Sequence, residues 1–122
     1  MPTLKDILLQ KVTFVCGPAD GLHVLCDVRD VLPHSSVLRK MISDVDPEEE
    51  GFKFNCRGFD QDTVRLCIDK MKTPWQFFDD LKDSAWVTKE VFRFYDMLDI
   101  QVMQQIIIRM ANTSPNVKLV LA

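Results

Sequence analysis

The strongest constraint on the fold is a pair of short alternating runs near the N-terminus, separated by a turn-forming segment. Residues 12–16 and 22–27 each place apolar side chains at every second position. A period of two is typical of β-strands with one buried face. Between the runs, residues 17–21 read Gly-Pro-Ala-Asp-Gly, and glycine and proline favour the backbone conformations of a turn. The sequence therefore predicts an antiparallel hairpin.

After the hairpin, the apolar spacing changes to that of helices, with one further strand. We expect a short helical turn at residues 28–34, and then a helix that Ser35 or Ser36 caps. Apolar residues between positions 37 and 45 of this helix recur with a period near 3.6, which gives one buried stripe. Residues 52–56 again alternate and predict a third strand.

The C-terminal half reads as a series of helices. Asp60 caps a helix that ends at Thr73-Pro74, and two later helices span about 88–98 and 102–111. The expected inward-facing residues are Val64, Cys67, Ile68, Met71, Val91, Phe92, Tyr95, Leu98, Val102, Met103, Ile106, Ile107 and Met110.

A chain of 122 residues has the usual size of one domain with one core. We divide it into an N-terminal lead-in at 1–10, a domain at 11–112 and an apolar C-terminal tail at 113–122. The apolar share of 47% is that of a globular protein. One folded α+β domain is therefore the default expectation.

Charge and composition argue against several classes of function. The net charge is −3 and the basic residues are scattered, which disfavours nucleic-acid binding. Apolar runs such as residues 106–108 are far shorter than the ~20 residues that span a bilayer, and the N-terminus lacks a signal-peptide pattern. No cysteine pair has C-x-x-C spacing, so reduced core thiols are expected. These features indicate a soluble cytoplasmic or nuclear protein without membrane contact.

The sequence contains no assembled set of residues for catalysis or for holding a metal ion. His23 lies on a predicted strand and His34 beside a helix cap, and neither belongs to a catalytic motif; no phosphate-binding, dinucleotide or zinc-hydrolase motif is present. The acidic loop at 46–51 lacks the alternating ligands of a calcium loop. We expect no enzyme, cofactor or metal. A thiol enzyme that uses Cys16, Cys26, Cys56 or Cys67 is a further alternative with little support.

The aromatic segment at residues 74–86 is the sharpest candidate for function, because large apolar groups are costly to expose unless they cover the core or meet a partner. Both alternatives remain open for this segment. The stripe on the late helices, with Phe92, Tyr95, Met103 and Ile107, reads mainly as core. Its methionines offer a second hypothesis, a groove that receives the amphipathic helix of a partner.

The order of these elements resembles the BTB/POZ superfamily over residues 11–111. Residues 31–42, Val-Leu-Pro-His-Ser-Ser-Val-Leu-Arg-Lys-Met-Ile, are similar to the family's helix pair after the hairpin. Residues 91–100, Val-Phe-Arg-Phe-Tyr-Asp-Met-Leu-Asp-Ile, are similar to the late helix of the SCF ubiquitin-ligase adaptor and elongin C branch. Phe94 and Tyr95 depart from that branch, which has two small residues there. Asp96 and Met97 stand where the SCF adaptor carries an Asn-aromatic pair that faces the cullin.

The resemblance implies a BTB/POZ-like α+β fold, in which a small three-stranded sheet packs against a cluster of five to six helices. It also implies an adaptor that joins a cullin-like scaffold to the helical box of a substrate receptor. The candidate partner-binding residues are Trp75, Phe77, Phe78, Leu81, Trp86, Asp96, Met97, Met103, Ile107 and Met110.

The alternative function is a BTB-type homodimer that serves as a scaffold module in a chromatin, germline or cytoskeletal assembly, without a ligase role. In that case the first strand and the helix pair at 28–45 form a two-fold interface. The candidate self-association residues are Val12, Phe14, Val31, Leu32, Leu38 and Met41.

Overall fold

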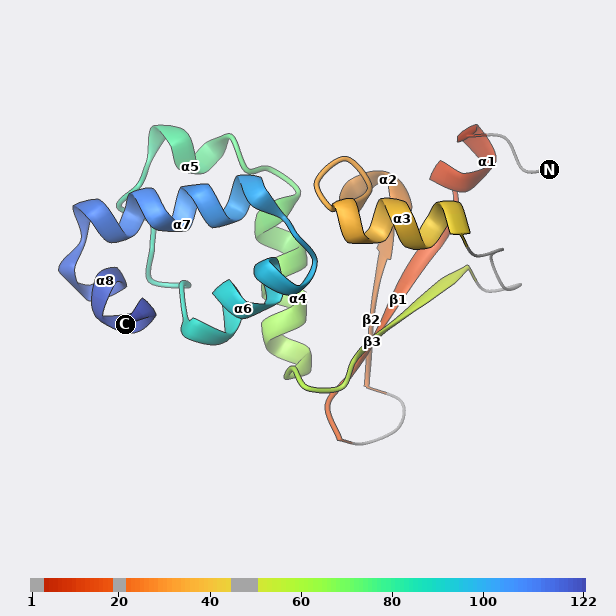
Figure 1. The fold of residues 1–122 in the computed structure, drawn as a ribbon, viewed down its shortest axis with the longest axis horizontal. Coiled ribbons are helices and arrows are strands. Elements are labelled where there is room, and N and C mark those ends of the chain that lie inside the picture. Colours follow the sequence, from red (N-terminus) through yellow and green to blue (C-terminus); the bar gives the residue numbers. More distant parts are fainter. Residues whose placement is uncertain (1–3, 19–21, 45–50) are drawn as a thin grey trace.

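The computed structural model describes residues 4–18, 22–44 and 51–122. In chain order the elements are α1 (Leu4–Leu8), β1 (Lys11–Cys16), β2 (His23–Asp27), α2 (Val28–Val31), α3 (Ser36–Asp44), β3 (Phe52–Cys56), α4 (Gln61–Met71), α5 (Gln76–Asp79), α6 (Lys89–Met97), α7 (Gln101–Thr113) and α8 (Pro115–Leu121). The sheet and α1 to α3 lie toward one end of the long axis, α5 to α8 lie toward the other, and α4 stands between them (Figure 1).

The sheet has the strand order β2-β1-β3. Strand β1 pairs antiparallel with β2, from Lys11 opposite Asp27 to Val15 opposite His23, so the predicted hairpin is confirmed. Residues 19–21 of its predicted turn lie outside the described residues. Strand β3 pairs parallel with the other edge of β1. Parallel neighbours need a long crossover connection, and the stretch that carries α2 and α3 supplies it.

One face of the sheet forms part of the core. Val12, Phe14 and Cys16 on β1 are fully buried, and their neighbours across the parallel ladder include Phe52 and Cys56. These residues share one face because side chains alternate along a strand with a period of two. The predicted apolar alternation of β1 and β3 is therefore confirmed, and it fixes the register of the parallel pair.

Side-chain caps begin three helices, and those of α3 and α4 were predicted from the sequence. The Ser35 hydroxyl accepts a hydrogen bond from the Leu38 N–H at 3.1 Å, which settles the alternative between Ser35 and Ser36. Asp60 caps α4 through the Asp62 N–H at 3.2 Å, and Thr88 caps α6 through the Val91 N–H. Each cap satisfies a backbone donor that has no partner within the helix.

Helix α6 buries more of its surface than the sequence predicts. Phe94 is fully buried, although only Val91, Phe92, Tyr95 and Leu98 were expected to face inward. Its ring meets Phe14 of β1 edge-on at 6.1 Å and Phe59 at 5.6 Å. Phe92 is only half-buried. Phe92 still packs against the core, so the prediction was wrong only in omitting Phe94, which is buried because α6 packs against other helices and also reaches the sheet through this side chain.

The C-terminal segment is helical where an apolar tail was expected. Pro115 opens α8 at its first turn, where a missing N–H costs nothing, and Val117 is buried. Helix α8 packs on α7 and α6. Within the described residues the chain forms eight helices where five to six were expected. Besides α8, the short helices α1 and α5 were not predicted. The mixed α+β class with a three-stranded sheet is confirmed.

Candidate partner-binding surfaces

Four of the predicted partner-binding residues belong to the core. Met103, Ile107 and Met110 on α7 are fully buried, and Phe77 on α5 is only 4% exposed. Helix α7 packs against α6 and against α8, so its apolar stripe is buried by contacts within the chain. In this conformation these four side chains are not available to a partner. The core interpretation of the late-helix stripe therefore describes the structure better than the open groove.

The aromatic segment at 74–86 combines both alternatives at different residues. Phe77 and Trp86 pack together with their ring centroids 5.2 Å apart, and the Trp86 indole N–H donates to the Asp83 carbonyl at 2.8 Å. Trp75 and Phe78 are instead 61% and 45% exposed. Leu81 is half-buried against the core. One part of the segment is thus a lid on the core, and the other part is surface.

One of the two exposed aromatic residues, Phe78, lies beside the C-terminal half of α7. The Arg109 guanidinium lies 5.3 Å from the centre of the Phe78 ring, within the range of a cation–π contact. Ile108, the neighbour of Arg109 on α7, is also exposed. Arg109 has its apolar stem available for packing, so it covers part of the Phe78 ring. Among the residues that the structure describes, Trp75 is the largest exposed apolar side chain.

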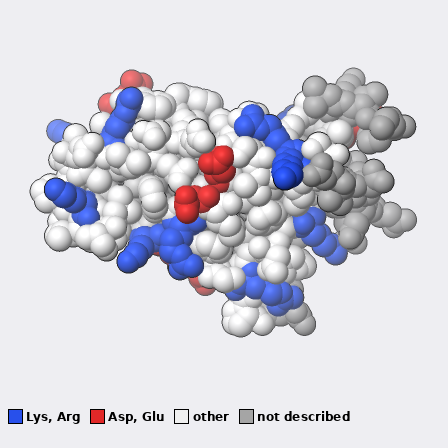
Figure 2. Space-filling view, viewed as in Figure 1, with Lys and Arg blue, Asp and Glu red and all other residues white. Residues whose placement is uncertain are grey.

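Asp96 and Met97, the pair that the resemblance compares with the adaptor's Asn-aromatic motif, lie at the end of α6. Asp96 is exposed and accepts a hydrogen bond from the Gln104 side-chain amide at 3.1 Å, while Met97 is half-buried. Figure 2 shows a small acidic group near the middle of this face, with lysine and arginine side chains in separate small groups around it. Asp96 is therefore accessible to a partner, and Met97 is partly accessible.

Most of the predicted self-association residues are inside the molecule. Val12, Phe14, Val31 and Leu38 are fully buried, whereas Leu32 and Met41 are partly buried. The inner face of β1 meets the side chains of the helices, which leaves no apolar strand surface there for a second copy. The expectation that these four form a two-fold interface disagrees with their burial in the single chain.

Sequence reasoning missed an apolar surface next to α8. Leu119 and Val120 are 74% and 38% exposed. Beside them is a depression of about 350 Å³, which we call the α8 depression; its lining includes Ala85, Val87, Val117 and Val120. A second hollow of about 280 Å³ adjoins it and shares Lys82, Ser84 and Ser114. A signal was available in Ser114-Pro115, because proline is favoured in the first turn of a helix and the apolar residues at 117 and 119–121 follow it.

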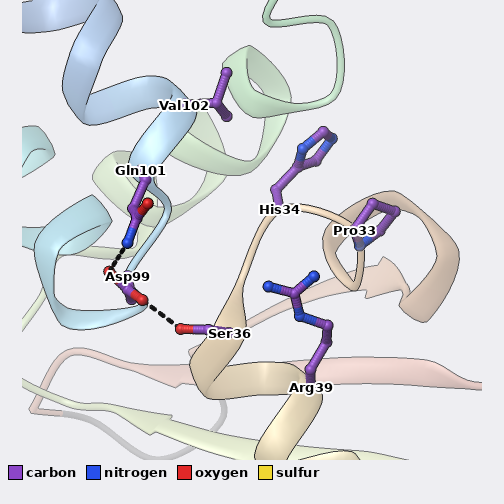
Figure 3. Close-up of a pocket in the computed structure, with 7 residues that line it drawn as sticks. All are labelled: Pro33, His34, Ser36, Arg39, Asp99, Gln101 and Val102. Atoms are coloured by element: carbon purple, nitrogen blue, oxygen red, sulfur yellow. Dashed lines mark hydrogen bonds between the residues drawn. The ribbon is translucent and has the colours of Figure 1, made fainter.

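A separate depression, with a volume of about 240 Å³, lies where α3 meets the turn between α6 and α7 (Figure 3). We call it the α3–α7 pocket; its lining includes Pro33, His34, Ser36, Arg39, Asp99 and Val102. Asp99 has a positive φ of 53°, a left-handed conformation that aspartate tolerates better than most residues. Its carboxylate accepts hydrogen bonds from the Ser36 hydroxyl and, at 3.3 Å, from the Gln101 side-chain amide. The pocket is therefore built from both halves of the molecule.

The four cysteines are free and buried. Burial raises the pKa of the Cys26, Cys56 and Cys67 thiols to about 12, and it also raises the pKa of Cys16. A thiol is nucleophilic as thiolate, so a raised pKa makes it a poor nucleophile at neutral pH. Within the described residues, no three histidine, cysteine, aspartate or glutamate side chains gather in a metal-binding arrangement. This environment gives the thiol-enzyme alternative no support.

Comparison of the chain with protein families, curated proteins and solved structures finds no match. The BTB/POZ relationship therefore stays a prediction from the order of elements and the two sequence fragments. None of the helices formed by the described residues has the length and apolar character needed to cross a bilayer.

Proposed function

We propose that the protein is an adaptor that binds a helical segment of one partner protein at the α8 depression. The observation that carries this proposal is the apolar surface of α8, where Leu119 and Val120 stand exposed beside the hollow. Exposed apolar side chains that border a depression are typical of protein-binding sites, because burial in a complex removes them from water.

The shape and chemistry of this surface suit an amphipathic helix. The apolar part of the lining comes from Ala85, Val87, Val117 and Val120, while Ser84 and Asn116 supply polar groups at the edge. In such complexes a few apolar anchors at helical spacing carry most of the affinity. The resemblance to the SCF adaptor branch implies the same arrangement, with the C-terminal helices holding the helical box of a substrate receptor.

The second partner of the proposed adaptor is a cullin-like scaffold. The resemblance to the SCF adaptor branch compares the exposed Asp96 and the half-buried Met97 with the pair that faces the cullin. Compared with an Asn-aromatic pair, they keep an apolar contact but lose the donor hydrogens of the amide. Two separate surfaces, one at α8 and one at the end of α6, would allow both partners to bind together.

The test is affinity purification from the native source with the wild-type chain and with a Leu119→Asp, Val120→Asp double variant. We expect a partner with an amphipathic helix to co-purify with the wild type and to be lost from the double variant. The matched control is Leu25→Asp. Leu25 is 61% exposed, a value between those of Leu119 and Val120, and it lies on β2, far from α8 (Figure 1). This control should retain the partner.

Three results would contradict parts of the proposal. Retention of the partner by the α8 double variant would remove the α8 depression from the interface. A stable complex that contains no cullin would refute the ligase role and leave the adaptor role. A symmetric dimer at micromolar concentration in sedimentation experiments would favour the self-association alternative, whereas the adaptor is expected to be a monomer or a heterodimer.

A further inference from the structure

The α3–α7 pocket has a rigid frame. The Ser35 hydroxyl donates to the Leu98 carbonyl at 2.6 Å, and the neighbouring Ser36 hydroxyl donates to Asp99. These two contacts join the start of α3 to the turn before α7. Since both partners of each contact are held by helices or by the turn between helices, the pocket walls keep their positions without a ligand. A preformed site spares a ligand the cost of ordering it.

Arg39 supplies a cation that no other described residue neutralises. Its side chain is exposed, and Figure 3 shows the guanidinium turned toward the pocket beside His34 and Pro33. Among the residues that the structure describes, none forms an ion pair or hydrogen bond with this guanidinium. Asp99 lines the same pocket, but its two carboxylate oxygens already accept from Ser36 and Gln101. The donors of Arg39 are therefore available to a ligand.

We propose that the α3–α7 pocket binds the side-chain carboxylate of a glutamate or aspartate in a partner protein, with Arg39 as its principal ligand. A planar guanidinium matches a carboxylate through two parallel N–H···O hydrogen bonds. Pro33 and Val102 contribute apolar atoms to the lining beside this ion pair. This contact is separate from the α8 depression and does not rest on the proposed adaptor function.

The charge of the pocket selects the ligand class. Asp99 contributes one negative charge near the site, which disfavours a doubly charged phosphate more than a singly charged carboxylate. A cationic ligand is disfavoured because Arg39 repels it and because Asp99 already has two donors. Helices α3 and α7 extend away from the pocket in opposite directions (Figure 1), so a partner backbone can cross the opening while a side chain enters.

The proposal is tested by NMR titration of the isotope-labelled full chain with acetyl-Ala-Glu-Ala-amide. We expect saturable shifts of the Gln101 and Val102 amides and of the Arg39 side chain, with a dissociation constant of order 1 to 10 mM. The neutral isostere acetyl-Ala-Gln-Ala-amide should bind about tenfold more weakly, since a charge-assisted hydrogen bond becomes a neutral one. Arg39→Gln should weaken the binding of the Glu peptide by about tenfold or more.

Two variants make the result specific. Lys40→Gln removes the same charge from the same turn of α3, but Lys40 does not line the pocket, so binding should be unchanged. Asp99→Asn keeps an acceptor for Ser36 and suits the left-handed backbone, and it should strengthen binding of the Glu peptide by several-fold because a repulsive charge is gone. A gain of affinity cannot arise from a variant that merely fails to fold.

The proposal is overturned by any of four outcomes. These are equal binding of the Gln and Glu peptides, wild-type affinity in Arg39→Gln, tighter binding of inorganic phosphate than of the Glu peptide, and tighter binding of acetyl-Ala-Ala with its free terminal carboxylate. The last outcome would assign the pocket to a chain end and not to a side chain.

Discussion

Replacing Ser35 by alanine should destabilise the protein more than a typical polar substitution on its surface. Ser35 is fully buried, and its hydroxyl makes two hydrogen bonds. It accepts from the Leu38 N–H at 3.1 Å and so caps α3, and it donates to the Leu98 carbonyl at 2.6 Å, where α6 ends. One oxygen atom thus connects the α2–α3 side of the fold to the α6–α7 side.

The expected cost is the sum of two losses. Loss of a serine cap costs about 1 kcal/mol of folding free energy. The Leu98 carbonyl would be left buried without its donor, and an unsatisfied buried acceptor costs about 1 to 3 kcal/mol. Together these give about 2 to 4 kcal/mol, a large part of the roughly 5 to 15 kcal/mol that stabilises a typical domain. For a chain of this length, Tm should fall by about 4 °C per kcal/mol.

Urea unfolding followed by circular dichroism measures the change in the free energy of unfolding, provided that the m-value is unchanged. Ser43→Ala is the matched control because Ser43 is an exposed serine in the same helix, and we expect a change within about 0.5 kcal/mol. Ser36→Ala removes only the half-buried contact with Asp99 and should cost about 0.5 to 1.5 kcal/mol. If Ser35→Ala costs less than about 1 kcal/mol, or no more than Ser36→Ala, the argument for this junction is wrong.

Three further predictions concern other parts of the fold. Gly51 has a φ of +96°, and an added Cβ would overlap the Lys11 carbonyl, so Gly51→Ala should lower the free energy of unfolding in urea by about 2 kcal/mol or more. The control Gly58→Ala places its methyl group in open space and should change this free energy by no more than about 0.5 kcal/mol. The four cysteines should react with an aromatic disulfide reagent at neutral pH only as fast as the protein opens, because they are buried; rapid labelling of the native chain would contradict this. Burial lowers the pKa of His34 below its usual 6.5, so the unfolded chain binds the proton more tightly and the free energy of unfolding should decrease as pH falls through about 6.5 and below. His34→Gln should reduce this slope in urea titrations at several pH values, and an unchanged slope would show that other groups cause it.

The sequence alone determined the features that depend on neighbouring residues. The hairpin strands, the helix cap at Asp60 and the buried face of α4 all follow from local patterns. A cap needs only a side-chain oxygen within a few residues of a free N–H. A strand or helix with one buried face has apolar residues at a fixed spacing in the sequence. These features can therefore be predicted without knowledge of the tertiary contacts.

Only the tertiary structure decided which apolar side chains are core and which are surface. Phe77 is buried and its neighbour Phe78 is exposed, although both are the same residue type in one short segment. The parallel pairing of β3 with β1, the burial of Phe94 and the pocket beside Arg39 likewise depend on segments that are distant in the chain. The physical reason is that burial and pocket shape are properties of contacts between elements, whereas periodicity is a property of one element.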